Sequence, residues 1–144
     1  MLSEIDLDGI KVLLEKAGLT VRYGRLEDVP LYPGVYSGYY GVLLSYESMT
    51  RQKELNHSVI SEVIRLGFLA SGSVGQLNSF EAREKAIYAM ARLAYEVFEV
   101  GDNLSTESGL RRIMAVDYTR SDDLLVKTPV KLVGLDITLA REVD

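Results

Sequence analysis

The sequence predicts an α+β fold in which a mainly antiparallel sheet is packed by one long helix and a short N-terminal helix, and carries a protruding β-hairpin arm. Three observations support this fold. Apolar residues alternate with a period of two in segments that follow one another in hairpin order. Two other segments have helical periodicity, and they do not alternate with the strands as βαβ units would. We expect the 144 residues to form a single domain, 1–144, because we find neither a repeat nor a linker.

Ser3-x-x-Asp6, which resembles a capping box, predicts the start of the N-terminal helix. Leu2 and Leu7 are placed as a hydrophobic staple around it. Gly18 supplies the stop. The apolar residues between them recur at helical spacing: Ile10, Leu13, Leu14 and Ala17. A brief strand is expected over 19–26, followed by a loop with two prolines over 27–34.

Two strands with period-two alternation come next, and we expect them to pair as a hairpin. The first begins at Gly41. The second has one apolar face that is interrupted only by Glu62. The face is made of Ile60, Ile64, Leu66, Phe68 and Ala70. The intervening segment 49–58 is polar and has no Gly or Pro, so it is either a mobile loop or a continuation of both strands as an arm, which we favour.

The longest helix is expected over 79–100, with Asn78-x-x-Glu81 as a second capping signal. Its apolar stripe contains Phe80, Ala86, Ile87, Met90, Leu93, Ala94 and Val97, and small side chains at Ala82, Ala86 and Ala89 would permit a close approach to a sheet. Segment 101–109 is a loop by composition. Strands are then expected over 113–119 and 124–127, separated by a turn. The core face of a final strand carries Val133, Leu135, Ile137 and Leu139.

Composition excludes several classes of function. With no cysteine, disulfides, thiol catalysis and thiolate metal sites are absent. A net charge of −5 disfavours a protein that grips phosphates, and the nearest basic pairs are short and close to acids: Arg51 with Lys53, and Arg111 with Arg112. No apolar run approaches membrane-spanning length. The acidic N-terminus lacks the lysines of a secretory signal, so we expect a cytoplasmic origin.

Histidine and glycine motifs are weak candidates for chemistry. His57, the single histidine, lies in the polar arm, and no GxSxG elbow exists for a hydrolase. The stretch GSVGQ precedes a helix, but no lysine follows Gly75 as a Walker loop requires. Asp122 and Asp123 supply only part of a calcium site and are better interpreted as turn residues.

Two acids lie inside otherwise apolar strands. If Asp117 and Asp136 faced one pocket, they could act as a general acid/base pair. Alternation places Asp136 opposite the core residues, toward solvent or a partner. Asp117 shares a face with Ile113 and Ala115, and its side is left open by the pattern. No metal site and no cofactor are expected.

The segment YPGVYSGYYG, residues 32–41, is unusually rich in tyrosine. No basic residue lies between Leu31 and Met49, which disfavours a nucleic-acid platform. Three alternatives are a protein–protein surface, the lip of a small-ligand pocket, and a simple cover over the rim of the chain's own core.

The order of elements resembles that of the tail terminator family of long-tailed bacteriophages. The resemblance covers nearly the whole chain and lies in the order and lengths of the segments. These are an N-terminal helix, a short strand, a Pro-containing loop leading into GVLLSYES, a polar arm, the return strand SEVIRLGFLAS, one long helix from FEAREKAIYAM, and a closing hairpin ending in VKLVGLDITLARE. It includes no residue-level motif, so no functional residues are carried over. Head-completion proteins of the neck share a similar plan and are an alternative.

The resemblance implies a structural virion protein without enzymatic activity. Such a protein closes into a ring, usually of six copies, on the end of the tail tube, stops tube polymerisation and provides the docking surface for the head connector or stopper protein. It would assemble in the host cytoplasm and reside in the virion, away from membranes. DNA would pass through an acidic lumen without specific binding.

Under this hypothesis six residues are the first candidates for contacts between subunits or with the tube. They are Tyr36, Tyr39, Tyr40, Arg51, Lys53 and Glu54. The rival of another class is a small ligand-binding or enzymatic α+β domain whose pocket is rimmed by the same three tyrosines.

Overall fold

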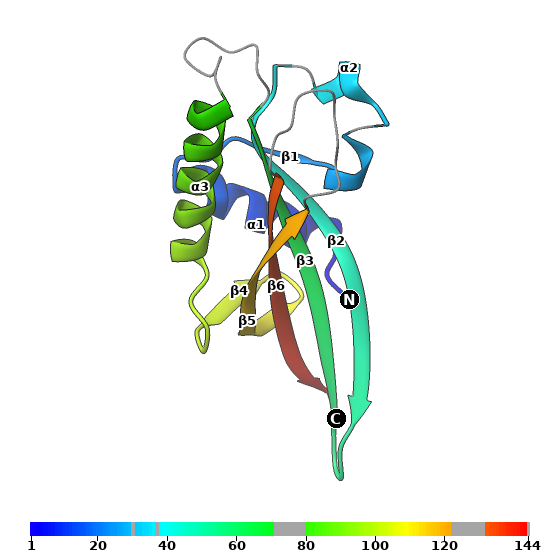
Figure 1. The fold of residues 1–144 in the computed structure, drawn as a ribbon. Helices are drawn as coiled ribbons and strands as arrows, with labels where there is room; N and C mark the ends of the chain where they lie inside the picture. The colour runs from blue at the N-terminus through cyan, green and yellow to red at the C-terminus, as the bar shows by residue number, and fades with distance from the viewer. Residues whose placement is uncertain (30, 37, 71–79, 122–131, 144) are drawn as a thin grey trace.

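The computed structural model describes residues 1–29, 31–36, 38–70, 80–121 and 132–143. Its elements are α1 (Glu4–Lys16), β1 (Val21–Tyr23), η1 (Leu26–Asp28), α2 (Pro33–Tyr36), β2 (Tyr40–Lys53), β3 (Ser58–Ala70), α3 (Phe80–Val97), β4 (Asn103–Thr106), β5 (Gly109–Ser121) and β6 (Leu132–Val143). The six strands form one curled sheet in the order β1-β2-β3-β6-β5-β4 (Figure 1). Only the β1–β2 pair is parallel. The fold is therefore α+β with a mostly antiparallel sheet, as predicted.

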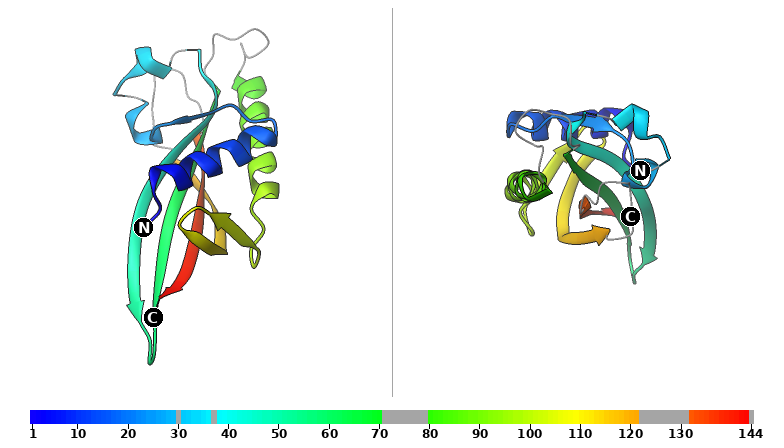
Figure 2. Two further views of the ribbon diagram at one scale, coloured as in Figure 1. Left: turned by 180° about the vertical axis from the view of Figure 1, so that it is seen from behind. Right: turned by 45° about the horizontal axis from the view of Figure 1, so that its top comes forward.

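The two sides of the sheet have different cover. Residues of α1 and α3 share one large apolar cluster with the side chains of β2, β3, β5 and β6 that point to the same side. On the other side a smaller cluster joins Leu26, Val29 and Tyr36 to Leu43 and Leu69. Figures 1 and 2 show this second cover, made by η1 and α2, at one end of the sheet only. We call the side that carries α1 and α3 the helix face, and the opposite side the outer face.

Helix α1 begins with the capping box that the sequence predicts. The backbone N–H of Asp6 donates to Oγ of Ser3 over 3.2 Å, and the N–H of Ser3 donates to Oδ2 of Asp6 over 2.9 Å. Gly18 follows the last turn with φ +97°, a conformation that glycine adopts without strain. Its N–H donates to the carbonyl of Glu15 over 3.0 Å, so the predicted stop is confirmed.

The segment between β1 and β2 is more regular than the predicted loop over 27–34. It contains the 3₁₀ turn η1 and the single helical turn α2, which starts at Pro33. Proline is common at the first position of a helix because its missing N–H has no helical partner there. The two short helices form the crossover that a parallel pair such as β1–β2 requires.

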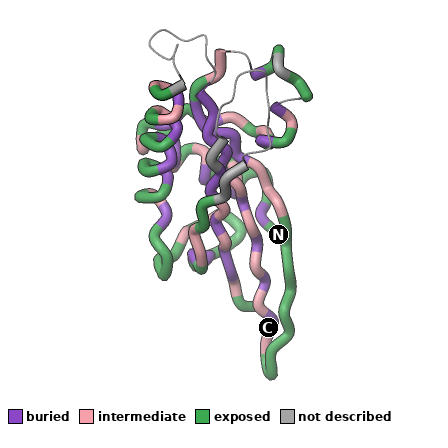
Figure 3. Tube along the Cα trace, in the orientation of Figure 1, coloured by how far each residue is buried: buried purple, intermediate pink, exposed green. Residues whose placement is uncertain are grey.

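Strands β2 and β3 pair as the expected hairpin, from Tyr40 opposite Ala70 to Lys53 opposite Ser58. Their pairing continues through the polar segment, where residues 48–56 are exposed (Figure 3). A bulge between Tyr46 and Ser48 shifts the register once. In Figure 1 the hairpin extends beyond α1 and α3. Residues 49–60, which make up this end, are called the distal hairpin below.

Helix α3 buries a narrower stripe than expected. Ile87, Met90 and Ala94 are buried as predicted. Leu93 is 41% exposed and Ala89 is exposed, so their assignment to the packed face is wrong. Each lies one residue from a buried position, which is roughly 100° around the helix. Asn78 lies outside the described residues.

The C-terminal strands correct one prediction and confirm another. Segment 101–109 is more than a loop, since β4 pairs with β5 from Asn103 opposite Arg112 to Thr106 opposite Gly109. The segment has the composition of a loop because it also contains the tight turn between β4 and β5, where Gly109 has φ +126°. Leu135, Ile137 and Leu139 of β6 are buried, as predicted. The predicted strand 124–127 lies outside the described residues.

Candidate functional site

The tyrosine-rich segment is folded against its own domain. Tyr36 is buried in the smaller apolar cluster and Tyr39 packs at its edge. The guanidinium carbon of Arg22 lies 5.2 Å from the ring centre of Tyr36 and 5.1 Å from that of Tyr39, within cation–π range. Burial raises the pKa of Tyr39 to about 12, against the opposing effect of Arg22. The local sequence gave no sign of this cation, because Arg22 comes from β1.

Only Tyr40, which is 40% exposed, presents much of its ring to solvent among these three candidates. The Oη of Tyr39 donates to the carbonyl of Val42 over 2.8 Å, which holds that ring against β2. Of the alternatives left open by the sequence, the cover over the chain's own core describes Tyr36 and Tyr39 best. Tyr40 retains the role of a candidate contact.

Basic side chains of the distal hairpin and of β6 lie together on the helix face. Arg51 lies opposite Ile60, and Ile60 lies opposite Arg141, so the two arginines flank one isoleucine. Lys53 lies on the same face, opposite Ser58. Arg51 and Lys53 are exposed, and neither has an ion-pair partner among the residues that the structure describes. Of the six predicted contact residues, Arg51 and Lys53 therefore lie on one face of the distal hairpin, together with Arg141.

The turn of this hairpin is closed by polar contacts. The N–H of Glu54 donates to the carbonyl of His57 over 2.8 Å. The Nε2 of His57 lies 3.2 Å from Oε2 of Glu54 and 3.9 Å from Oε1 of Glu142. Between them Leu55 is 100% exposed. His57 thus has a role in holding the turn, and it lies far from any cleft described below.

Asp136 lies on the outer face and is held by Arg65. The Nε and Nη2 of Arg65 donate to its two carboxylate oxygens over 2.7 and 3.0 Å. Glu27 and Glu47 also approach this guanidinium, at 3.1 and 3.7 Å. The hydrogen bonds that Arg65 donates to Asp136 raise the pKa of Arg65 above its ordinary range, against the effect of burial. The group is a structural tie between η1, β2, β3 and β6.

Asp117 lies directly opposite Asp136 in the β5–β6 register. The expectation that it shares a face with Ile113 is wrong, because a register shift between Ile113 and Ala115 separates them. Ile113 is buried on the helix face, while Asp117 is exposed on the outer face. Both oxygens of Asp136 are already bound by Arg65, so the two acids do not form the general acid/base pair that a shared pocket would permit.

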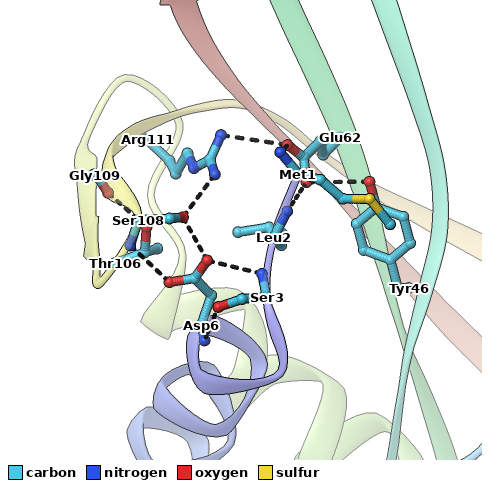
Figure 4. Close-up of polar contacts among 10 residues, drawn as sticks. All are labelled: Met1, Leu2, Ser3, Asp6, Tyr46, Glu62, Thr106, Ser108, Gly109 and Arg111. Carbon is cyan, nitrogen blue, oxygen red and sulfur yellow. Dashed lines mark hydrogen bonds and ion pairs between the residues drawn. The ribbon is translucent and has the colours of Figure 1, made fainter.

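A buried polar cluster that was not predicted from the sequence lies on the helix face (Figure 4). Its centre is Glu62, the one interruption of the apolar face of β3. Nη1 of Arg111 lies 3.3 Å from Oε1 of Glu62, and each side chain is 1% exposed. Leu2 N–H and Tyr46 Oη donate to Oε2 over 2.7 and 3.1 Å. The amino group of Met1 lies 3.4 Å from Oε1.

The same cluster continues to α1 through Ser108. Nη2 of Arg111 donates to Oγ of Ser108 over 2.9 Å, and that hydroxyl donates to Oδ2 of Asp6. The N–H of Ser108 donates to Oδ1 of Asp6 over 3.0 Å. Burial of Asp6 opposes ionisation, but the hydrogen bonds from Ser108 and Ser3 outweigh it and hold the pKa of Asp6 well below the usual range.

This cluster links α1, β2, β3 and the β4–β5 turn, and its oxygens are occupied by protein donors. A carboxylate in that state is a structural member and has no free oxygen for proton transfer. The signal for it in the sequence was Glu62 on an apolar face. Its partner Arg111 could not be predicted from the sequence. Strands β3 and β5 are neighbours of β6 on its two sides, and this strand order is set by the tertiary fold.

The described surface includes three hollows. A groove of about 480 Å³ runs between α1 and β4, with Ile5, Gly9 and Leu13 on one wall, Leu104 on the other and Glu107 on the rim. A second is lined by Glu4, Leu7, Asp8 and Tyr23, and a third by Tyr95, Glu96, Phe98, Glu99 and Val100. None of these three hollows is lined by Tyr36, Tyr39 or Tyr40.

Within the described ranges no group of three or more His, Cys, Asp or Glu side chains is arranged to hold a metal ion. No helix in that part of the chain has the length and apolarity to cross a membrane. The GSVGQ stretch and the pair Asp122 and Asp123 lie outside the described residues. No protein-family model and no curated protein sequence matches this chain.

Proposed function

We propose that the chain is a structural subunit without enzymatic activity, which closes into a ring on the head-proximal end of a phage tail tube. The ring terminates tube polymerisation and offers a docking surface to the head connector. A head-completion role in the neck uses the same kind of ring and is the alternative within this proposal. The partners are further copies of the chain, the tube protein and the connector, and DNA passes through the lumen.

The observation that carries this proposal is a sheet with two incompletely covered edges. On one side β1 pairs with β2 only from Val42 to Leu44, although β2 continues to Lys53. On the other side β4 pairs with β5 only from Gly109 to Arg112, although β5 continues to Ser121. Both statements concern the described residues. Exposed edges of this length invite pairing with another chain.

The two edges differ from each other, which bears on the kind of assembly. A contact between two different surfaces of one protein is heterologous, and it produces a closed ring when the rotation between neighbours closes. The edge of β2 ends in the distal hairpin, which we propose acts as the arm that reaches a neighbour or the tube. Arg51, Lys53, Glu54 and Tyr40 are the contact residues in this proposal.

Light scattering over a range of concentrations, followed by electron microscopy of the protein with and without purified tail tubes, tests the proposal. We expect either a ring close to six times the 16.0-kDa monomer, or a monomer that forms a ring at the tube end. Replacing both Arg51 and Lys53 by glutamate should leave the circular dichroism spectrum intact and abolish tail joining. A protein that stays monomeric at every concentration and does not bind tail tubes would contradict the proposal.

A further inference from the structure

We infer that Leu55, at the turn of the distal hairpin, inserts into the groove between α1 and β4 of a second copy of this chain. The inference rests on the proposed ring and names one contact within it. It is argued from three features: an exposed apolar side chain on an ordered turn, an apolar groove elsewhere on the same surface, and opposite charges around the two.

Leu55 is presented by a turn that is held in one conformation. The last strand pair, Lys53 opposite Ser58, leaves only four residues to make the turn. The backbone hydrogen bond from Glu54 to His57 and the 3.2 Å approach of Nε2 of His57 to Oε2 of Glu54 close it. A fully exposed leucine on such a turn loses little conformational freedom when it is buried in a partner, which favours binding.

The groove between α1 and β4 has the chemistry to receive an aliphatic side chain. Ile5 is 59% exposed on one wall, and Leu104 contributes the other wall. Gly9 forms a gap between Ile5 and Leu13 on the helix surface, because a Cβ at this position would meet no heavy atom within 4 Å. Exposed apolar walls with an open floor are the features of a docking groove.

The charges around Leu55 and around the groove favour a second copy of the chain as the occupant of the groove. Arg51 and Lys53 precede the turn that carries Leu55, both on β2, and have no ion-pair partner among the described residues. The acid next to Leu55, Glu54, is exposed and contacts His57. Glu107 stands exposed on the rim of the groove, and Glu4 stands exposed next to Ile5 in the first turn of α1. A basic tip and an acidic rim attract each other and set the orientation of the contact.

The tip lies away from α1 and β4, which line the groove, as Figures 1 and 2 show. The hairpin turn is at the far end of the sheet, whereas α1 and β4 lie beside the body of the domain. One copy can therefore give its tip to one neighbour and its groove to another, which is the heterologous arrangement that a ring needs.

The test uses one variant for each surface. Leu55→Asp removes the apolar tip at a fully exposed position, and Gly9→Leu places a side chain in the groove of the partner, where a Cβ would meet no heavy atom within 4 Å. Gly9→Ala is the matched control, since its Cβ leaves most of the groove open. Both Gly9 variants also favour the helix, because glycine is the poorest helix former after proline. Circular dichroism and thermal unfolding establish that all three fold.

Light scattering then measures association. We expect Leu55→Asp and Gly9→Leu each to weaken self-association about tenfold or more, equivalent to about 1.4 kcal/mol, while Gly9→Ala stays near wild type. Each variant keeps one intact surface, so mixing the two should give a dimer that neither forms alone and that cannot grow further. Reversing Arg51 and Lys53 to glutamate should weaken association, and adding Glu107→Lys and Glu4→Lys should restore it.

The outcomes separate this contact from the proposed function. If wild type forms rings and Leu55→Asp forms them equally well, this contact is overturned and the ring stands on another one. If wild type self-associates in solution and the mixed variants give no dimer, the contact is likewise overturned. If wild type forms no assembly alone or on tail tubes, the proposed function falls and takes this contact with it.

Discussion

Glu62 and Arg111 form an ion pair across an intervening strand: their charged atoms are 3.3 Å apart, and β6 lies between β3 and β5 in the sheet. Both side chains are on the helix face, and each is 1% exposed. The pair therefore belongs to the core, where a charge is tolerated only with its partner and with further hydrogen bonds. Leu2 and Tyr46 supply those bonds to Glu62, and Ser108 accepts one from Arg111.

Removal of Arg111 alone should be strongly destabilising. Arg111→Met leaves the Glu62 carboxylate buried without its main partner, and we expect a loss of about 3 kcal/mol in the free energy of unfolding. The double variant Glu62→Gln with Arg111→Met should recover part of that loss, because glutamine is neutral and still accepts from Leu2 and Tyr46. Urea unfolding at pH 7 measures both. A single variant within about 0.5 kcal/mol of wild type would show that the pair is not buried in solution.

Asp6 should make the protein sensitive to acid. Its folded-state pKa lies below the ordinary value of 3.8, so its contribution to stability is fully present above that value and is lost as the pH falls toward the folded-state pKa. Asp6→Asn should therefore be less stable than wild type at pH 7, with the gap narrowing by about 1.4 kcal/mol for each pH unit below 3.8. Urea unfolding at pH 7, 4 and 3 checks this. A gap that stays constant with pH would contradict the role given to the carboxylate.

Gly67 should not tolerate a side chain. A Cβ built at this position would lie 2.3 Å from Cγ of Leu26, which covers the outer face there. We expect Gly67→Ala to lower the free energy of unfolding by about 1–3 kcal/mol through overpacking, and Leu26→Ala in the same chain to relieve part of the strain. Gly9→Ala, where the space is open, is the control in the same unfolding assay. Equal effects of the two alanine substitutions would be inconsistent with the packing described.

The elements that follow from local chemistry were predictable. Ser3 and Asp6 announce the start of α1 because both partners of a capping box lie within one turn. The alternation in β3 identifies its core face correctly, because the side-chain period of a strand is fixed by its geometry. Features that depend on tertiary partners were not. The bulge between Ile113 and Ala115 moved Asp117 to the other face, and no residue type marks it.

In the candidate site, too, features that depend on tertiary partners could not be predicted from the sequence. Arg51 and Lys53 were named from the sequence as contact candidates in the arm, and their shared face follows only from the strand pairing of the structure, since residues two apart in a strand point the same way. Tyr36 and Tyr39 were grouped with Tyr40 by proximity in the chain, yet in the structure Tyr36 is buried in the smaller cluster and Tyr39 packs at its edge, both within cation–π range of Arg22. Glu62 was noticed only as an interruption, because its partners come from three separate elements.

Strand β3 has a neighbour along nearly all of its length, β2 from Ser58 to Ala70 and β6 from Ser58 to Phe68, and the β3–β6 ladder has no register shift. A strand of this length spans roughly 40 Å. A slip of one residue between β3 and β6 would move every apolar side chain of β3 from the helix face to the outer face. The register of the distal hairpin is therefore fixed by the packing of the domain's core.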